Sequence, residues 1–257
     1  MISQLEKEIT LRYLKTRKKD GFLNIISIFS FIGISLGVAV LIIVMSVMNG
    51  FRTELVEKIV GFNPHAVIKP YDLPINENLF NDKDLINLSE NFVYSNSGEG
   101  VLINKNYTKG LLLRGYLAKD FEKLSVVKNA NFYGNKKLNP MFISIGKELS
   151  FNYNIKVGDK VLIMSPNGVQ TIIGNLPKQE TYIVDSIFDS EIADFDQNVA
   201  FINLNDLENF FDLEKNKRNL EVYLKTPKNI EVTKKKLEKI FEDYYIYTWS
   251  DLNKSLF

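Results

Sequence analysis

The feature that most constrains this chain is a long apolar stretch near its N-terminus. Residues 21–51 contain no Asp, Glu, Lys, Arg or His, and the apolar centre Ile25–Met48 is 24 residues long. At about 1.5 Å per residue this centre forms roughly 36 Å of helix, enough to cross a hydrocarbon layer about 30 Å thick. Fifteen of its residues are Ile, Leu, Val or Phe. The stretch therefore predicts a transmembrane helix rather than the core helix of a globular domain.

Basic residues flank the stretch unequally. Six precede it within the first 20 residues, and three follow it before residue 70. Because Lys and Arg resist translocation, we expect residues 1–20 to stay cytoplasmic and residues 52–257 to be exported. A cleaved signal peptide has an apolar region of about 7–15 residues and small residues at its cleavage site. The run here is longer and ends in a poor cleavage site, Ser46–Asn49, so it is interpreted as a permanent anchor.

Composition narrows the chemistry of the remaining residues. The 257 residues include 32 basic and 31 acidic side chains, a balance that gives no long-range attraction for nucleic acid. There is no Cys, which excludes disulfides and Cys-based zinc sites or catalysis. The single His, His65, would have to serve any Ser-His-Asp triad.

The pattern after the anchor predicts an α+β fold. An amphipathic helix is expected to continue the anchor over 52–60, and further helices are expected at 143–153 and 233–244. Residues 71–97 are polar and Asn-rich, with one short helix predicted at 82–89. Short strands are predicted between these helices, at 65–69, 100–103, 110–117, 161–164, 182–188, 199–203, 220–225 and 245–248.

Two glycines inside the anchor, Gly33 and Gly37, form a G-x-x-x-G motif. Small residues let membrane helices approach closely, so the motif predicts a face that packs on partner helices. The alternative is chance spacing, because Gly is common in membrane helices.

No stretch predicts catalysis or the binding of a cofactor or metal. The pair Gly146-Lys147 lacks the other residues of a phosphate-binding loop, because positions 141 and 148 are Met and Glu. The acidic residues of 189–196 fit no calcium-loop spacing. They are interpreted as a solvated turn.

The segment Pro166–Gln179, PNGVQTIIGNLPKQ, is unusual for an exported domain. It carries one charge, Lys178, and five apolar residues, counting Pro177. A fourteen-residue loop is long for a compact domain, and an apolar loop either packs in the core or meets a partner. The residues by themselves favour the core.

Several runs, in order along the whole chain, resemble the lipoprotein-releasing ABC permeases LolC and LolE. The run Ser-Val-Met-Asn-Gly-Phe at 46–51 is specific. The other matching runs are Leu11–Leu14, Ile32–Val38, Gly61–His65, Ile145-Gly146 with Val157–Asp159, Gly174–Gln179, and Trp249 with Ser255–Phe257.

The resemblance implies a fold and a domain organisation. Residues 1–20 would be a cytoplasmic lead-in, 21–51 the transmembrane helix, and 52–257 a periplasmic α+β domain of the mechanotransmitting, MacB-like permease type. Family members have four membrane helices, so this chain is expected to be a fragment that stops before the second. Its location would be the bacterial inner membrane.

The resemblance also implies a task. Such permeases lift acylated lipoproteins from the membrane and pass them to a periplasmic chaperone, LolA, while a separate subunit, LolD, hydrolyses ATP. The implied partners are therefore the lipid bilayer, lipoprotein cargo, a LolA-like chaperone, a LolD-like ATPase and a second permease subunit, in a homodimer or a heterodimer. The chain itself would not be an enzyme.

Single residues acquire roles in the same way. Met48 matches a position that faces substrate at the periplasmic end of the first helix. Pro166–Gln179 matches the protruding hairpin by which the LolC type grips the chaperone, here called the hook, and this reading replaces core packing. The LolC type carries a basic residue beside the hook, at a position near Leu162. This chain departs from that pattern, because Leu162 is apolar. The hook favours the LolC type, or a hybrid subunit, over LolE. The implied chaperone contacts are Ile172, Ile173, Leu176, Pro177, Lys178 and Gln179.

Two other classes remain open. A related mechanotransmitting permease, exporting drugs or toxins or regulating cell-wall hydrolases, would lack the hook. A complete single-pass periplasmic sensor or adaptor would need no ATPase partner.

Overall fold

The computed structural model describes residues 4–14, 21–104, 107–171, 174–227 and 230–252. The chain divides into two compact units, Met1–Val56 and Glu57–Phe257.

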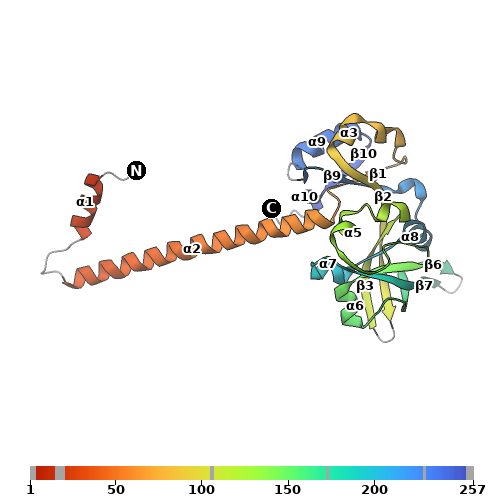
Figure 1. Ribbon diagram of the computed structural model, residues 1–257, viewed down its shortest axis with the longest axis horizontal. Helices are drawn as coiled ribbons and strands as arrows, with labels where there is room; N and C mark the ends of the chain where they lie inside the picture. The colour runs from red at the N-terminus through yellow and green to blue at the C-terminus, as the bar shows by residue number, and fades with distance from the viewer. Residues whose placement is uncertain (1–3, 15–20, 105–106, 172–173, 228–229, 253–257) are drawn as a thin grey trace. The chain divides into compact units, whose positions relative to one another are not determined.

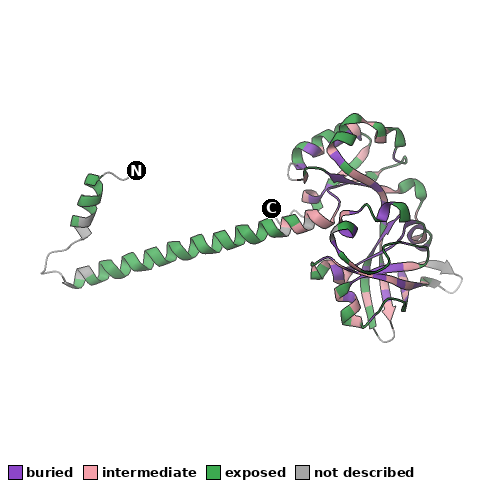
Figure 2. Ribbon diagram, viewed as in Figure 1, coloured by how far each residue is buried: buried purple, intermediate pink, exposed green. Residues whose placement is uncertain are grey.

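The first unit holds α1 (Gln4–Leu14) and most of α2 (Gly21–Phe62). Among the described residues, one helical segment, Ile25–Phe62, is long and apolar enough to cross a membrane by length and composition, and an 18-residue window within it has a mean hydropathy of 2.8. Its side chains are exposed from Ile25 to Glu54 (Figure 2). The predicted helical continuation over 52–60 is confirmed.

The second unit is an α+β domain, as the sequence predicts, and Figure 1 shows its strands and short helices. In the part of the chain that the structure describes, its strands are β1 (Ala66–Pro70), β2 (Ser89–Asn104), β3 (Tyr107–Tyr116), β4 (Asn131–Gly134), β5 (Phe142–Gly146), β6 (Lys160–Thr171), β7 (Gly174–Asp189), β8 (Val199–Asn203), β9 (Asn219–Leu224) and β10 (Tyr244–Thr248). The α-helices are α3 (Lys83–Leu88), α4 (Ala118–Phe121), α5 (Ser125–Asn129), α6 (Lys147–Tyr153), α7 (Ala193–Asn198), α8 (Leu204–Phe211), α9 (Ile230–Ile240) and α10 (Trp249–Leu252), with 3-10 turns η1 (Glu77–Asn81) and η2 (Lys215–Lys217).

Six strands pair in a closed ring. β2 pairs with β3, β3 with β8, β8 with β5, β5 with β7, β7 with β6, and β6 again with β2. Closing a sheet on itself removes its free edges. The long strand β2 pairs with β6 through its second half and with β9 through its first half, and β9 continues the sheet to β1 and β10.

The interior of this barrel is the main hydrophobic core. It is lined by alternate residues of the six strands and closed by apolar side chains of α8, including Leu102, Leu113, Ile143, Ile145, Ile163, Tyr182, Val184, Ile202, Leu207 and Phe210. A second, aromatic cluster around Phe121, Phe188 and Phe201 includes the partly buried Phe62, the last residue of α2.

Two sequence predictions are wrong in detail. The expected helix at 143–153 is a strand in its first part, because β5 inserts between β7 and β8, and only Lys147–Tyr153 is helical. The run 89–97 is the first half of β2 rather than a polar connection. In both cases pairing partners distant in sequence supply the hydrogen bonds that select the extended form.

Candidate functional site

The hook is the outer end of the β6–β7 hairpin. Beyond the barrel the two strands stay paired, with Gly168 opposite Pro177 and Thr171 opposite Gly174. The pairing of β6 with β2 ends at Met164, and the pairing of β7 with β5 begins only at Ile183. The segment is therefore a two-stranded ribbon that leaves the barrel, and Figure 1 shows its described part projecting from the domain. The sequence reasoning treated Pro166–Gln179 as a fourteen-residue loop, and the structure pairs its described residues as two strands.

The predicted contact residues of the hook differ in their surroundings. Leu176 is 52% exposed, and Pro177 and Gln179 are also exposed. Ile172 and Ile173 lie outside the described residues. An exposed Leu beside an exposed Pro on a projecting ribbon offers apolar surface to a partner.

Lys178 is bonded within the chain. Its ammonium donates a hydrogen bond to the backbone carbonyl of Asn209 and forms an ion pair with Asp212 at 2.9 Å. Both partners lie at the C-terminal end of α8. The structure thus connects the base of the hook to the barrel through a side chain that the sequence predicted only as a contact residue.

Leu162 lies in β6 between Ile103 of β2 and Thr181 of β7, and it is half-buried. An apolar residue suits this position inside the sheet. Leu162 is uncharged, so it does not supply the basic side chain that the LolC type carries beside the hook.

The membrane-side candidates lie on α2. Met48 is 61% exposed, and a side-chain atom added at Gly33 or Gly37 would meet nothing within 4 Å in this chain. These residues are free to contact lipid or other helices, and no described residue covers them.

The end of α2 is tied to the sheet by His65. The ring nitrogen Nδ1 accepts the backbone N–H of Leu224 at 2.7 Å, and Nε2 lies 3.0 Å from the carbonyl oxygen of Val60. Because an N–H can only donate, Nδ1 is unprotonated and Nε2 carries the hydrogen. Burial lowers the pKa of His65, against the opposing effect of the Val60 carbonyl. Both nitrogens are occupied by backbone groups, so this imidazole is structural and cannot act as a catalytic base.

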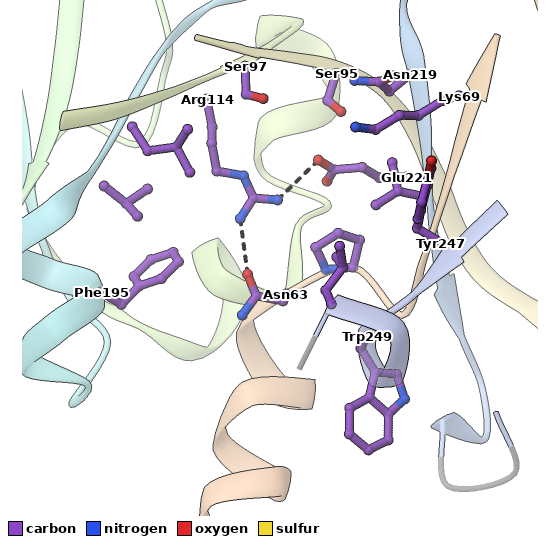
Figure 3. Close-up of a pocket in the computed structure, with 15 residues that line it drawn as sticks. Asn63, Lys69, Ser95, Ser97, Arg114, Phe195, Asn219, Glu221, Tyr247 and Trp249 are labelled. Carbon is purple, nitrogen blue, oxygen red and sulfur yellow. Dashed lines mark hydrogen bonds and ion pairs between the residues drawn. The ribbon is translucent and has the colours of Figure 1, made fainter. Parts of the chain in front are cut away.

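A buried polar network lies close to His65, whose ring packs against Tyr223 of this network. Figure 3 shows the Arg114 guanidinium between Glu221, at 3.0 Å, and the side chain of Asn63, at 3.3 Å. The Glu221 carboxylate also accepts the hydroxyl hydrogens of Tyr116 and Tyr223, at 2.9 and 3.0 Å. Burial raises the pKa of Tyr223 well above its usual value, and the neighbouring Glu221 raises it further, so the hydroxyl remains a donor.

The network forms one wall of a cavity of about 450 Å³. Apolar side chains make up much of the remaining wall, including Val67, Leu112, Phe195, Val199, Tyr247 and Trp249. The Glu221 charge is matched by Arg114 and two hydroxyls. The Arg114 and Glu221 charges are paired with each other, and Lys69 adds a further cation to the cavity wall. Sequence reasoning did not find this cavity because its residues come from distant strands.

The acidic turn at 189–196 is only partly solvated. Asp196 is buried and accepts hydrogen bonds from the backbone N–H of Ser190 at 3.1 Å and from the Ser190 hydroxyl at 2.5 Å. Burial raises the pKa of Asp196 to about 6. The interpretation as a solvated turn is thus wrong for Asp196. Among the described residues no group of three acidic or His side chains could hold a metal ion.

Comparison with known proteins identifies the relatives of this chain. The model of the MacB-like periplasmic core domain matches residues 27–240. The lipoprotein-releasing system transmembrane protein LolC of Neisseria meningitidis is 29% identical, over 98% of this chain and 63% of its own length. LolC of Xylella fastidiosa is 26% identical, over 83% of this chain and 53% of its own. LolE of Haemophilus influenzae is 48% identical over 60 residues, 23% of this chain and 14% of that protein.

This chain spans about half to two thirds of the length of the two LolC proteins. The match to the family model nevertheless includes both the apolar helix and most of the barrel domain. The chain therefore belongs to the MacB-like periplasmic core domain family and, within it, to the LolC/LolE-family permeases.

Proposed function

We propose that this chain is the anchored periplasmic part of an ATP-driven permease that extracts lipoproteins from the inner membrane and passes them to a periplasmic carrier of the LolA type. A separate LolD-like subunit hydrolyses ATP, and a second permease subunit completes the complex. The N-terminus is cytoplasmic, and the domain that follows α2 is periplasmic. The names of the LolC and LolE relatives support this assignment.

The observation that carries the proposal is the hook. A ribbon that leaves a closed barrel and exposes Leu176 and Pro177 has no packing role in the described part of this chain. Exposing apolar surface to water at the end of such a ribbon is energetically unfavourable. A binding partner that covers this surface removes it from water. We assign Ile172, Ile173, Leu176 and Pro177 to the carrier interface, with Gln179 at its base.

The expected affinity is modest. Burying these apolar side chains removes roughly 200–300 Å² from water, worth about 5–7 kcal/mol gross at ~25 cal/mol per Å². Association and ordering costs offset much of this, leaving binding on the order of micromolar.

In the membrane, Met48 faces the acyl chains of the lipoprotein cargo, and Gly33 and Gly37 pack on helices of the partner subunits. The exposure of these three positions on α2 is consistent with both roles. Close packing at small residues is the usual way in which membrane helices associate.

Carrier binding by the full chain in lipid nanodiscs tests the proposal. The purified LolA-type carrier of the same organism is titrated against the wild type, Ile173→Asp and Leu176→Asp. Each variant is expected to bind at least tenfold more weakly, with the melting temperature nearly unchanged. Phe151→Asp is the matched control, because Phe151 is 83% exposed and lies outside the hook. Equal carrier binding by the wild type and both hook variants would overturn the proposal in favour of a related permease that does not use such a carrier.

A further inference from the structure

The register of the β6–β7 pair shifts where the hook leaves the barrel. Met164 is opposite Gln179, but the next pair outward is Gly168 with Pro177. Residues 165–167 on β6 therefore face the single residue Lys178 on β7. A bulge of this kind bends its strand and increases the local twist. Pro166 lies in it, at a point where a residue without an N–H loses no ladder bond.

The residue opposite the bulge is the one that reaches the barrel. The Lys178 side chain is 30% exposed, and its ammonium contacts the Asn209 carbonyl and the Asp212 carboxylate. Asp212 caps α8 in the left-handed conformation, with φ 54°. The last carbonyls of a helix lack partners within the helix and carry partial negative charge. A cation is therefore well placed at this end of α8.

Helix α8 is a firm support for this contact. Leu207 and Phe210 are buried in the barrel core, and Glu208 is held by Arg218 through two hydrogen bonds of 2.6 and 2.7 Å. In contrast, the ribbon outside the bulge is stabilised by the pairing of its own two strands. An isolated two-stranded ribbon is only marginally stable in water, so its direction depends on how its base is held.

We infer that Lys178 is a positioning residue: by binding the C-terminal end of α8 opposite the bulge, it sets the direction in which the hook projects toward its carrier. The inference rests on the proposed function of the hook. It places Lys178 outside the set of residues that touch the carrier.

The direction of the hook can be measured by electron–electron distance spectroscopy on the full chain in nanodiscs. The chain has no Cys, so spin labels can be attached to cysteines introduced at Asn175 and at Lys119, an exposed residue of α4. The wild type is expected to give one narrow distance distribution. Lys178→Met and Asp212→Asn should widen it, whereas Lys178→Arg should keep it narrow. Asn tolerates the left-handed conformation of position 212, so Asp212→Asn removes the charge without backbone strain.

Binding of the purified LolA-type carrier completes the test. Lys178→Met should weaken binding about tenfold and Asp212→Asn about threefold, and the double variant should be no weaker than Lys178→Met alone. Glu214→Gln, which removes a nearby exposed charge paired with Lys217, is the control and should change nothing.

The outcomes separate the two proposals. If Asp212→Asn and Lys178→Met leave the distance distribution narrow, or if only Lys178→Met weakens binding, Lys178 touches the carrier directly and the positioning role is wrong. If Leu176→Asp also binds the carrier normally, the carrier assignment of the hook fails instead.

Discussion

The backbones of Gly146 and Asp196 touch. A Cβ atom added to Gly146 would lie 2.0 Å from the carbonyl oxygen of Asp196 and 2.4 Å from its Cα. Gly146 ends β5 and Asp196 lies in α7, so the missing side chain is what lets α7 pack on the end of the strand. The sequence pattern Gly-Lys at 146–147, which resembles part of a phosphate-binding loop, thus has a packing cause.

Gly146→Ala is expected to destabilise the domain by more than about 2 kcal/mol, because a backbone must shift to admit the methyl group. The free energy of unfolding, measured by denaturant titration, checks this. Gly110→Ala is the matched control: nothing lies within 4 Å of its Cβ position, and its effect should stay within about 1 kcal/mol. Equal effects of the two substitutions would contradict the close approach.

The buried carboxyl of Asp196 predicts a pH dependence. Burial raises its pKa from a usual value of 3.8 to about 6, so between these values the folded state binds more protons than the unfolded state. The contribution of Asp196 to stability is therefore full below pH 3.8 and is lost as pH rises through 6. The stability of the wild type minus that of Asp196→Asn should fall by up to about 3 kcal/mol between pH 4 and pH 7.

Asp251 supplies a control of opposite sign. Burial raises its pKa, but hydrogen bonds from Lys234 and Thr248 outweigh this and lower it to about 2. Its contribution is present above pH 3.8 and is lost as pH falls toward 2. The free energy of unfolding of the wild type minus that of Asp251→Asn should therefore rise with pH. This rise should occur at lower pH than the change expected for Asp196. Parallel curves for the two variants would refute the assignment.

His65→Leu is expected to cost about 2–4 kcal/mol at pH 7.5, because the buried N–H of Leu224 and the carbonyl of Val60 both lose their partner. Since the folded pKa of His65 lies below 6.5, its contribution is present above pH 6.5 and declines as pH falls. The difference between wild type and variant should therefore be smaller at pH 5.5. The single Trp, the buried Trp249, provides the fluorescence signal for unfolding.

The network around Glu221 predicts an order of effects. Tyr223→Phe removes one hydrogen bond and should cost about 1–2 kcal/mol. Glu221→Leu leaves the buried Arg114 charge unpaired and should cost about 3–5 kcal/mol. Thermal or denaturant unfolding measures both. A Glu221→Leu variant as stable as Tyr223→Phe would mean that the guanidinium finds another partner or water.

The orientation of the chain can be tested with single cysteines at Glu8 and Asp72, which are both exposed. In intact cells with a permeabilised outer membrane, an impermeant thiol reagent should label the cysteine at 72 and not the one at 8. The unequal basic flanks of the apolar stretch are the reason for this expectation. Labelling of both positions to the same extent would contradict the assignment of position 8 to the cytoplasm and position 72 to the periplasm.

The sequence by itself determined the features that depend on neighbouring residues. The absence of charge over 21–51 predicts the long apolar helix, and the amphipathic period of 52–60 predicts its continuation, which ends at Phe62 in the structure. The alternation of short strands and helices predicts the α+β class. Each of these follows from composition or periodicity within one segment.

Only the tertiary structure decided where segments meet. Ile143–Ile145 is a strand because β7 and β8 flank it, and the apolar hook is an extension of two barrel strands because β6 and β7 continue to pair. The roles of single side chains follow the same rule. The bond of His65 to Leu224 spans 159 positions, and that of Lys178 to Asp212 spans 34. A local pattern carries no record of such partners, because the packing of segments distant in sequence creates both the burial and the hydrogen bonds that define them.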